Sequence, residues 1–162
     1  MNDIFKDKLT ESIKIASIHK KRLNEAYQTI ASWGDFNIEL YSNLNNTQIA
    51  VTDQFVFRFA KLQDIIGEKI LKQSLDYLGE NTERLPFIDI LNKSHKIGLI
   101  ADAQQWMILR ESRNQIAHDY AILVEDVVTL FVSLLRKNEL LIVILDHIIQ
   151  FLSSKGLEIE KV

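Results

Sequence analysis

Residues 125–154 read EDVVTLFVSLLRKNELLIVILDHIIQFLSS, and this stretch decides the fold class. Its apolar residues recur at steps of three, four and seven, which is the period of an α-helix rather than of a strand. No Gly or Pro interrupts the pattern, so it predicts one long helix from Glu125 to Ser154. The apolar face comprises Val127, Val128, Phe131, Leu134, Leu135, Leu141, Ile142, Leu145, Ile148, Ile149 and Leu152.

The apolar face of this helix is wider than one partner helix needs. Such a face is typical of a central helix in a bundle, which is covered on several sides. It is equally typical of a helix shared with a second protomer, and twofold dimers are the commonest oligomers. Both explanations stay open from the sequence, and the second predicts a homodimer.

The rest of the chain also follows the helical period. One amphipathic helix is expected before Gly34, where Leu9, Ile13 and Ile30 belong to the apolar face. An Asn-rich stretch then predicts a loop, with room for one buried turn around Tyr41. The expected elements are helices at 3–33, 55–79, 86–97, 103–118 and 125–154 and a loop at 35–48. Together they predict a single all-α domain over residues 1–162, built as a four- to five-helix antiparallel bundle.

The composition excludes several classes of protein. The 162 residues include one Pro, five Gly and no Cys. This excludes collagen-like and disulfide-rich scaffolds, thiolate zinc sites and a cysteine nucleophile. The longest apolar run, Leu140 to Leu145, is far shorter than the ~18–20 residues of a membrane span. The first residues show no apolar signal-peptide core, so a cytoplasmic location and no membrane contact are expected.

The four histidines offer little support for a metal site. They lie at positions 19, 95, 118 and 147, and no two have the i, i+3 or i, i+4 spacing of a helical metal site. We therefore predict no metal and no cofactor. His19 lies in a basic run with residues 20–22, which is either a solvated helix face or a strip for phosphate. His95 is expected to complement a helix carboxyl end, and His147 to lie on a polar face or an interface.

The densest group of reactive side chains lies in residues 106–120, which read WMILRESRNQIAHDY. His118 could move a proton near neutral pH, and Arg113 could hold phosphate oxygens with its planar fork. Asn114, one helical turn before His118, could orient the imidazole. Arg110, Asp119 and Tyr120 complete the cluster. An equally weighted alternative is a polar helix end, in which Arg110 and Arg113 neutralise Glu111 and Asp119.

This stretch resembles the signature of HEPN-domain proteins. Four residues separate Arg113 from His118, one residue separates His118 from Tyr120, and Asn114 directly follows the arginine. Trp106 and Arg110 also resemble the helix that leads into that motif. The position between a short helix and a long final helix is similar too. The motif itself covers only residues 106–120, whereas the architecture would cover most of the chain.

The resemblance implies a dimeric all-α bundle whose two motifs face each other across a cleft. Many such proteins are metal-independent ribonuclease toxins, and their usual partner is a minimal nucleotidyltransferase antitoxin. By position, Arg113 and His118 would be catalytic, Arg110, Asn114 and Asp119 supporting, and Tyr120 the residue to which the antitoxin adds AMP. Other relatives are non-catalytic substrate-binding subunits of nucleotidyltransferases, and the motif does not separate these two functions.

One geometric feature is independent of the resemblance. Five residues separate Arg113 from His118, which places them about 140° apart around an ideal helix. They therefore do not share a helix face. Either the helix breaks near His118, or the site is assembled from two chains.

Overall fold

The computed structural model describes residues 2–118 and 123–160 and confirms the all-α class. Every regular element in these ranges is helical. The elements are α1 (Asn2–Ala31), α2 (Ile38–Ser42), α3 (Asn46–Ile65), the π-helical turn η1 (Ile66–Ile70), α4 (Leu71–Tyr77), α5 (Phe87–Lys96), α6 (Ala103–His118) and α7 (Val124–Ser154).

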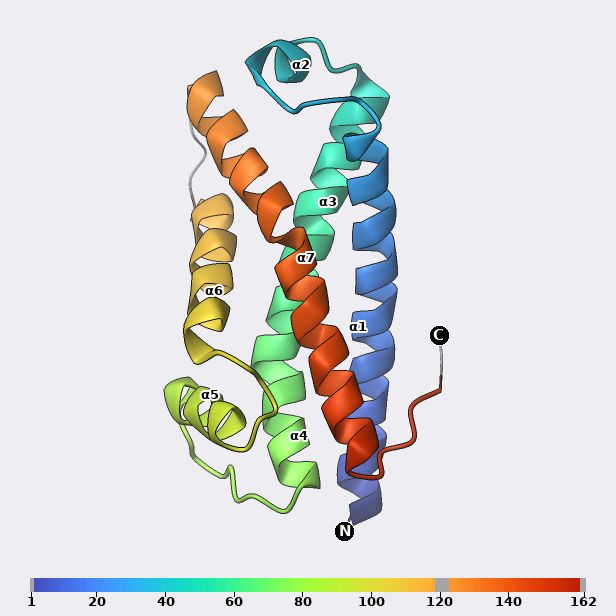
Figure 1. Ribbon diagram of the computed structural model, residues 1–162, viewed down its shortest axis with the longest axis vertical. Helices are drawn as coiled ribbons and strands as arrows, with labels where there is room; N and C mark the ends of the chain where they lie inside the picture. The colour runs from blue at the N-terminus through green and yellow to red at the C-terminus, as the bar shows by residue number, and fades with distance from the viewer. Residues whose placement is uncertain (1, 119–122, 161–162) are drawn as a thin grey trace.

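The long helices form an elongated bundle with antiparallel neighbours (Figure 1). α1 runs along α3, η1 and α4, which form one nearly continuous rod in the opposite direction. α7 crosses this pair obliquely, and α6 lies beside α7. The short α2 lies at one end of the bundle, and α5 lies below the start of α6 (Figure 1). Counting α3, η1 and α4 as one rod gives the five principal helices that the sequence predicts.

One apolar core joins these helices. The apolar positions predicted for the first helix, Leu9, Ile13 and Ile30, are buried in it. An aromatic group connects three helices, with the rings of Phe55 and Phe131 in edge-to-face contact at 5.6 Å between centroids. The 3.6-residue period thus predicted correctly that this face of the first helix is buried.

The structure corrects the expectation of a loop from Asp35 to Gln48. This stretch contains α2 and the first residues of α3, and the helical turn around Tyr41 is only partly buried. Asn45 and Gln48 form a capping box, in which the Asn45 side chain accepts from the Gln48 backbone N–H. The Gln48 side chain accepts in turn from the Asn45 backbone N–H. Both backbone N–H groups at the start of α3 therefore have a hydrogen-bond acceptor. α3 therefore begins nine residues before Phe55.

The rod of α3, η1 and α4 widens into the π-helical turn at Gly67, a glycine in the interior of the helix expected at 55–79. The Trp106 ring of α6 packs against Gly67, and a Cβ at this position would lie 2.9 Å from Trp106 Cζ2. Gly67 therefore permits a close approach of α6 to the rod. Single π-helical turns of this kind are frequent at functional sites.

Most of the wide apolar face of α7 packs against other helices of this chain. Phe131, Leu141 and Leu145 are among its buried residues, and Val143 is the large apolar side chain left most exposed in its middle. The structure thus accounts for the width of the face by a central position of α7. Within the described residues, no helix combines the length and hydropathy needed to span a bilayer.

Candidate functional site

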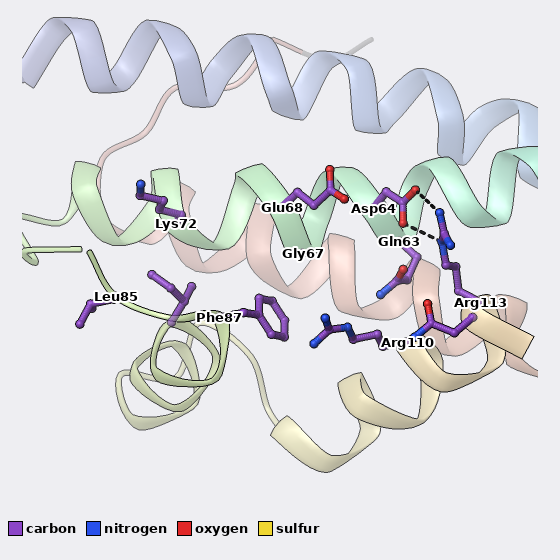
Figure 2. A pocket seen from close by; sticks show the side chains of 11 residues that line it. Gln63, Asp64, Gly67, Glu68, Lys72, Leu85, Phe87, Arg110 and Arg113 are labelled. Atoms are coloured by element: carbon purple, nitrogen blue, oxygen red, sulfur yellow. Dashed lines mark hydrogen bonds and ion pairs between the residues drawn. The ribbon is translucent and has the colours of Figure 1, made fainter. Parts of the chain in front are cut away.

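A cavity of about 450 Å³ opens between α3, η1, α5 and α6. Figure 2 shows its lining, with α6 contributing two arginines and the rod contributing a row of polar side chains. Three of the residues singled out in the sequence, Arg110, Arg113 and Asn114, lie in its wall. The remaining lining residues are Gln63, Asp64, Gly67, Glu68, Lys72, Leu85, Phe87 and Ile90.

Arg113 is held by a carboxylate from the neighbouring helix. Its Nε donates to Asp64 Oδ1 at 2.9 Å and its Nη2 donates to Asp64 Oδ2 at 3.0 Å. Two parallel charge-assisted hydrogen bonds fix the plane of the guanidinium as well as its position. The hydrogen bond that Arg113 donates to Asp64 raises the pKa of Arg113 above its ordinary value, against the opposing effect of burial. Arg113 therefore keeps its charge and points in one direction at the cavity edge (Figure 2).

Arg110 follows a different pattern, one turn earlier on the same helix. Its guanidinium carbon lies 4.6 Å from the centroid of the Phe87 ring. This is a cation–π contact, which leaves the nitrogen donors of Arg110 available to other groups. Among the described residues, the carboxylate that pairs with Arg113 is Asp64 rather than Glu111, and Arg110 lies over Phe87.

The end of the motif lies at the edge of the described residues. α6 remains helical to His118, so a break before His118 is excluded. Arg113 and His118 thus keep their offset of about 140° around one helix. Asn114 lies in the cavity wall one turn before His118. Asp119 and Tyr120 lie outside the described residues, as does the side chain of His118.

The same helix is anchored firmly by buried side chains and by a contact with α7. Trp106 and Leu109 are completely buried. On the side of α7, the Lys137 ammonium donates to Ser112 Oγ at 2.7 Å and to Ser133 Oγ at 3.0 Å. Ser112 directly precedes Arg113, so this contact fixes α6 at the residue before the ion pair. The arginines therefore project from a rigid support.

The other histidines have structural partners or lie at helix ends. His147 Nε2 lies 2.9 Å from the Gly98 carbonyl oxygen and joins α7 to the turn after α5. His95 lies in the last turn of α5, as expected for a group that complements a helix carboxyl end. Arg58 Nη1 contacts His19 Nδ1 at 3.0 Å, so His19 joins α1 to α3. Burial, followed by the charges of Arg58 and Lys61, lowers the pKa of His19.

Sequence reasoning missed Asp64, Gln63, Phe87 and Lys72 as members of the site. Gly67 alone carried a signal, as a glycine inside a long helical pattern. Asp64 is separated from Arg113 by 49 residues, and nothing in its own neighbourhood marks it as the partner. Across the described part of the chain, no group of three or more His, Asp or Glu residues converges as a metal site would require.

Comparison with known proteins adds no family to this description. No protein-family model, curated protein or solved structure matches the chain. The motif and the geometry of the cavity are therefore the features of this chain that bear on its function.

Proposed function

We propose that this chain is an endoribonuclease of the HEPN type, which cleaves RNA without a metal ion. The observation that carries the proposal is the fixed guanidinium of Arg113 at the edge of an open cavity. Arg113 lies on the same helix as His118, with Arg110 and Asn114 beside it. A charged fork of fixed orientation is suited to phosphate oxygens, on which charge develops in the transition state.

The reaction would be an internal transfer at phosphorus. The ribose 2′-oxygen attacks the phosphorus atom, the bond from phosphorus to the 5′-oxygen breaks, and a 2′,3′-cyclic phosphate and a 5′-hydroxyl result. One proton leaves the 2′-hydroxyl and one reaches the departing oxygen, and His118 is the group whose ordinary pKa suits such transfers. Because DNA lacks the 2′-hydroxyl, the same site would leave DNA intact.

The chain is proposed to act as a homodimer in which two motifs face one cleft. The offset of Arg113 and His118 on α6 supports this arrangement, because residues on different faces of one helix can meet across two chains. α6 and α7 also expose the apolar side chains of Met107, Ile108 and Val143. Sedimentation should give a dimer at micromolar concentration, and a monomer would remove the shared cleft.

Cleavage of RNA in the presence of EDTA tests the activity. We expect Arg113→Ala to lower the rate by about 100-fold or more, which is the effect of losing one oxyanion donor. His118→Ala should cost about 10²–10⁴-fold, as for a proton-transfer group. Arg22→Ala is the matched control, because this arginine pairs with Glu25 on α1 and does not line the cavity. Loss of cleavage with EDTA, or equal cleavage of DNA, would contradict the proposal.

The proposed partner is a minimal nucleotidyltransferase antitoxin that attaches AMP to Tyr120. The added phosphate would compete with RNA for the arginines of α6, and its bulk would block the cleft. Intact mass after co-expression with such an enzyme and ATP should show one added AMP, which Tyr120→Phe abolishes. Addition at Tyr27, Tyr41 or Tyr77 would contradict this mechanism.

A second candidate function is a non-catalytic subunit that presents substrate to a nucleotidyltransferase. The observation that favours it is the occupied guanidinium of Arg113, since a carboxylate already takes two of its donors. In this case the chain alone would bind RNA or nucleotide without cleaving it. Growth arrest by the chain alone, relieved by His118→Ala, would favour the toxin and exclude the subunit.

A further inference from the structure

The cavity continues beyond Arg113 into a second end that the cleavage step does not use. This end is formed by Gln63 of α3, Lys72 of α4, Phe87 of α5 and Arg110 of α6. Figure 2 shows Gln63 and Phe87 on either side of the Arg110 side chain. The set combines an amide, an aromatic ring and two cations, so it has the components of a binding site for a planar, anionic molecule.

Gln63 is a polar side chain that the described residues leave without a hydrogen bond. It is only 4 % exposed, and the exposed part lines the cavity. The Gln63 amide is not among the fully buried polar groups that lack a partner, so it is open to the cavity rather than sealed inside the core. A ligand that presents a donor beside an acceptor would satisfy both ends of this amide. The edge of a nucleobase has this pattern.

The ring of Phe87 and the guanidinium of Arg110 supply flat surfaces beside this amide. Arg110 already stacks on Phe87, with 4.6 Å between its guanidinium carbon and the ring centroid. Bases of single-stranded RNA stack on aromatic rings and on arginine planes, and each base contributes about 1–3 kcal/mol. Leu85 and Ile90 make this end of the cavity partly apolar, as ligand pockets commonly are.

The charge of the cavity favours an anion. Asp64 is engaged by Arg113, which leaves Lys72 and Arg110 against the single carboxylate of Glu68. None of these three forms a salt bridge with another described residue. The volume of about 450 Å³ lies within the range of small-molecule pockets, roughly 300–1,000 Å³. The cavity thus has the size and charge for one nucleotide.

We propose that this end of the cavity is a base-recognition subsite for the RNA strand, an inference that rests on the proposed ribonuclease function. One nucleotide next to the cleaved phosphate places its base against the Phe87–Arg110 pair and its edge on the Gln63 amide. Lys72 and Arg110 contact the phosphate of this nucleotide. The subsite would give the enzyme a sequence preference at one position beside the cut.

Sequencing the ends produced from a randomised RNA tests this subsite. The wild type should prefer one or two bases at a fixed position, and Gln63→Met should reduce that preference about tenfold while cleavage continues. Phe87→Leu should weaken binding at the same position by a similar factor. Gln73→Met is the matched control, because it makes the same substitution at a glutamine of the same rod that does not line the cavity. An unchanged preference in Gln63→Met and Phe87→Leu would overturn the proposal.

A binding measurement separates this proposal from the ribonuclease itself. If the wild type cleaves no RNA, the four nucleoside 5′-monophosphates are titrated and followed by side-chain amide NMR and Trp106 fluorescence. If Gln63→Met and Phe87→Leu weaken nucleotide binding and Gln73→Met does not, the subsite is supported even when the ribonuclease proposal fails. No binding, or binding that these two variants leave unchanged, overturns the subsite. Thermal unfolding of each variant shows that the fold is intact.

Discussion

Two neighbouring turns on one face of α6 differ sharply. Trp106 and Leu109 are completely buried against the rod and the core. Arg110, Arg113 and Asn114 line an open cavity. The earlier turn is fixed by packing, and the later turn holds charged groups that packing alone would not orient. The difference indicates that stability and chemistry depend on separate residues of one short helix, so variants should separate the two properties.

The contact between Gly67 and Trp106 predicts the largest loss of stability. Replacing a helix-interior glycine by alanine usually stabilises by roughly 0.5–1 kcal/mol. Here the new Cβ would lie 2.9 Å from Trp106 Cζ2, and overpacking of this kind costs about 1–3 kcal/mol. We therefore expect Gly67→Ala to lower the free energy of unfolding, measured by urea denaturation.

A double-mutant cycle shows whether the Trp106 ring is the cause. Trp106→Phe removes the six-membered ring of the indole, so the added methyl group of Gly67→Ala should cost much less in this background. If Gly67→Ala costs the same in both backgrounds, the packing explanation fails. RNA cleavage, measured at a temperature where each variant is folded, should change far less than stability does.

The ion pair in the later turn of α6 predicts the reverse result. Asp64→Asn removes the negative charge opposite Arg113, and because the pair is partly exposed we expect a loss of only about 1 kcal/mol of stability. Cleavage should fall roughly tenfold, because Arg113 keeps its charge but loses its fixed direction. Asp64→Glu should restore part of the rate. Glu68→Gln is the control, because Glu68 lines the same cavity without forming a salt bridge to a described residue.

The comparison of the two turns also shows why part of the site was predictable from the sequence. Arg110, Arg113 and Asn114 lie close together in one helix, so the helical period places them on neighbouring faces. Trp106 belongs to the same stretch. The partners from other helices, Asp64 above all, depend on how α3 and α6 pack. Periodicity reports which face of a helix is buried, but not which residue of another helix meets it.

The expected loop at 35–48 shows a different kind of error. The capping box of Asn45 and Gln48 has the sequence signature of a helix start, a short polar residue followed three positions later by Gln or Glu. The many asparagines in this stretch led to the prediction of a loop in spite of that signature. Asparagine favours both turns and helix N-caps, so composition alone did not distinguish a loop from the beginning of α3.

A second arginine contact joins Arg58 of α3 to His19 of α1. It predicts the smallest effect on stability, and it differs from the Arg113 ion pair in its response to pH. Arg58 donates to His19, which accepts only while its Nδ1 carries no proton. Burial and the nearby cations lower the pKa of His19, so protonation opposes the folded state. The stabilisation is therefore complete above about pH 6.5, the ordinary histidine value, and is lost as the pH falls towards the lowered pKa. Because the ring is only partly buried, we expect a loss below about 1 kcal/mol.

Urea denaturation at pH 7.5, 6.5 and 5.5 measures this dependence. His19→Gln keeps an acceptor for Arg58 at every pH, so its stability should vary less over this range than that of the wild type. His95→Gln is the control, because His95 is exposed at the end of α5 and should leave the wild-type dependence in place. If His19→Gln retains the full pH dependence, the contact between α1 and α3 is not its source. In contrast, the Arg113–Asp64 pair contains no histidine. Of the two arginine contacts, the one between Arg58 and His19 is therefore expected to be the more sensitive to acid.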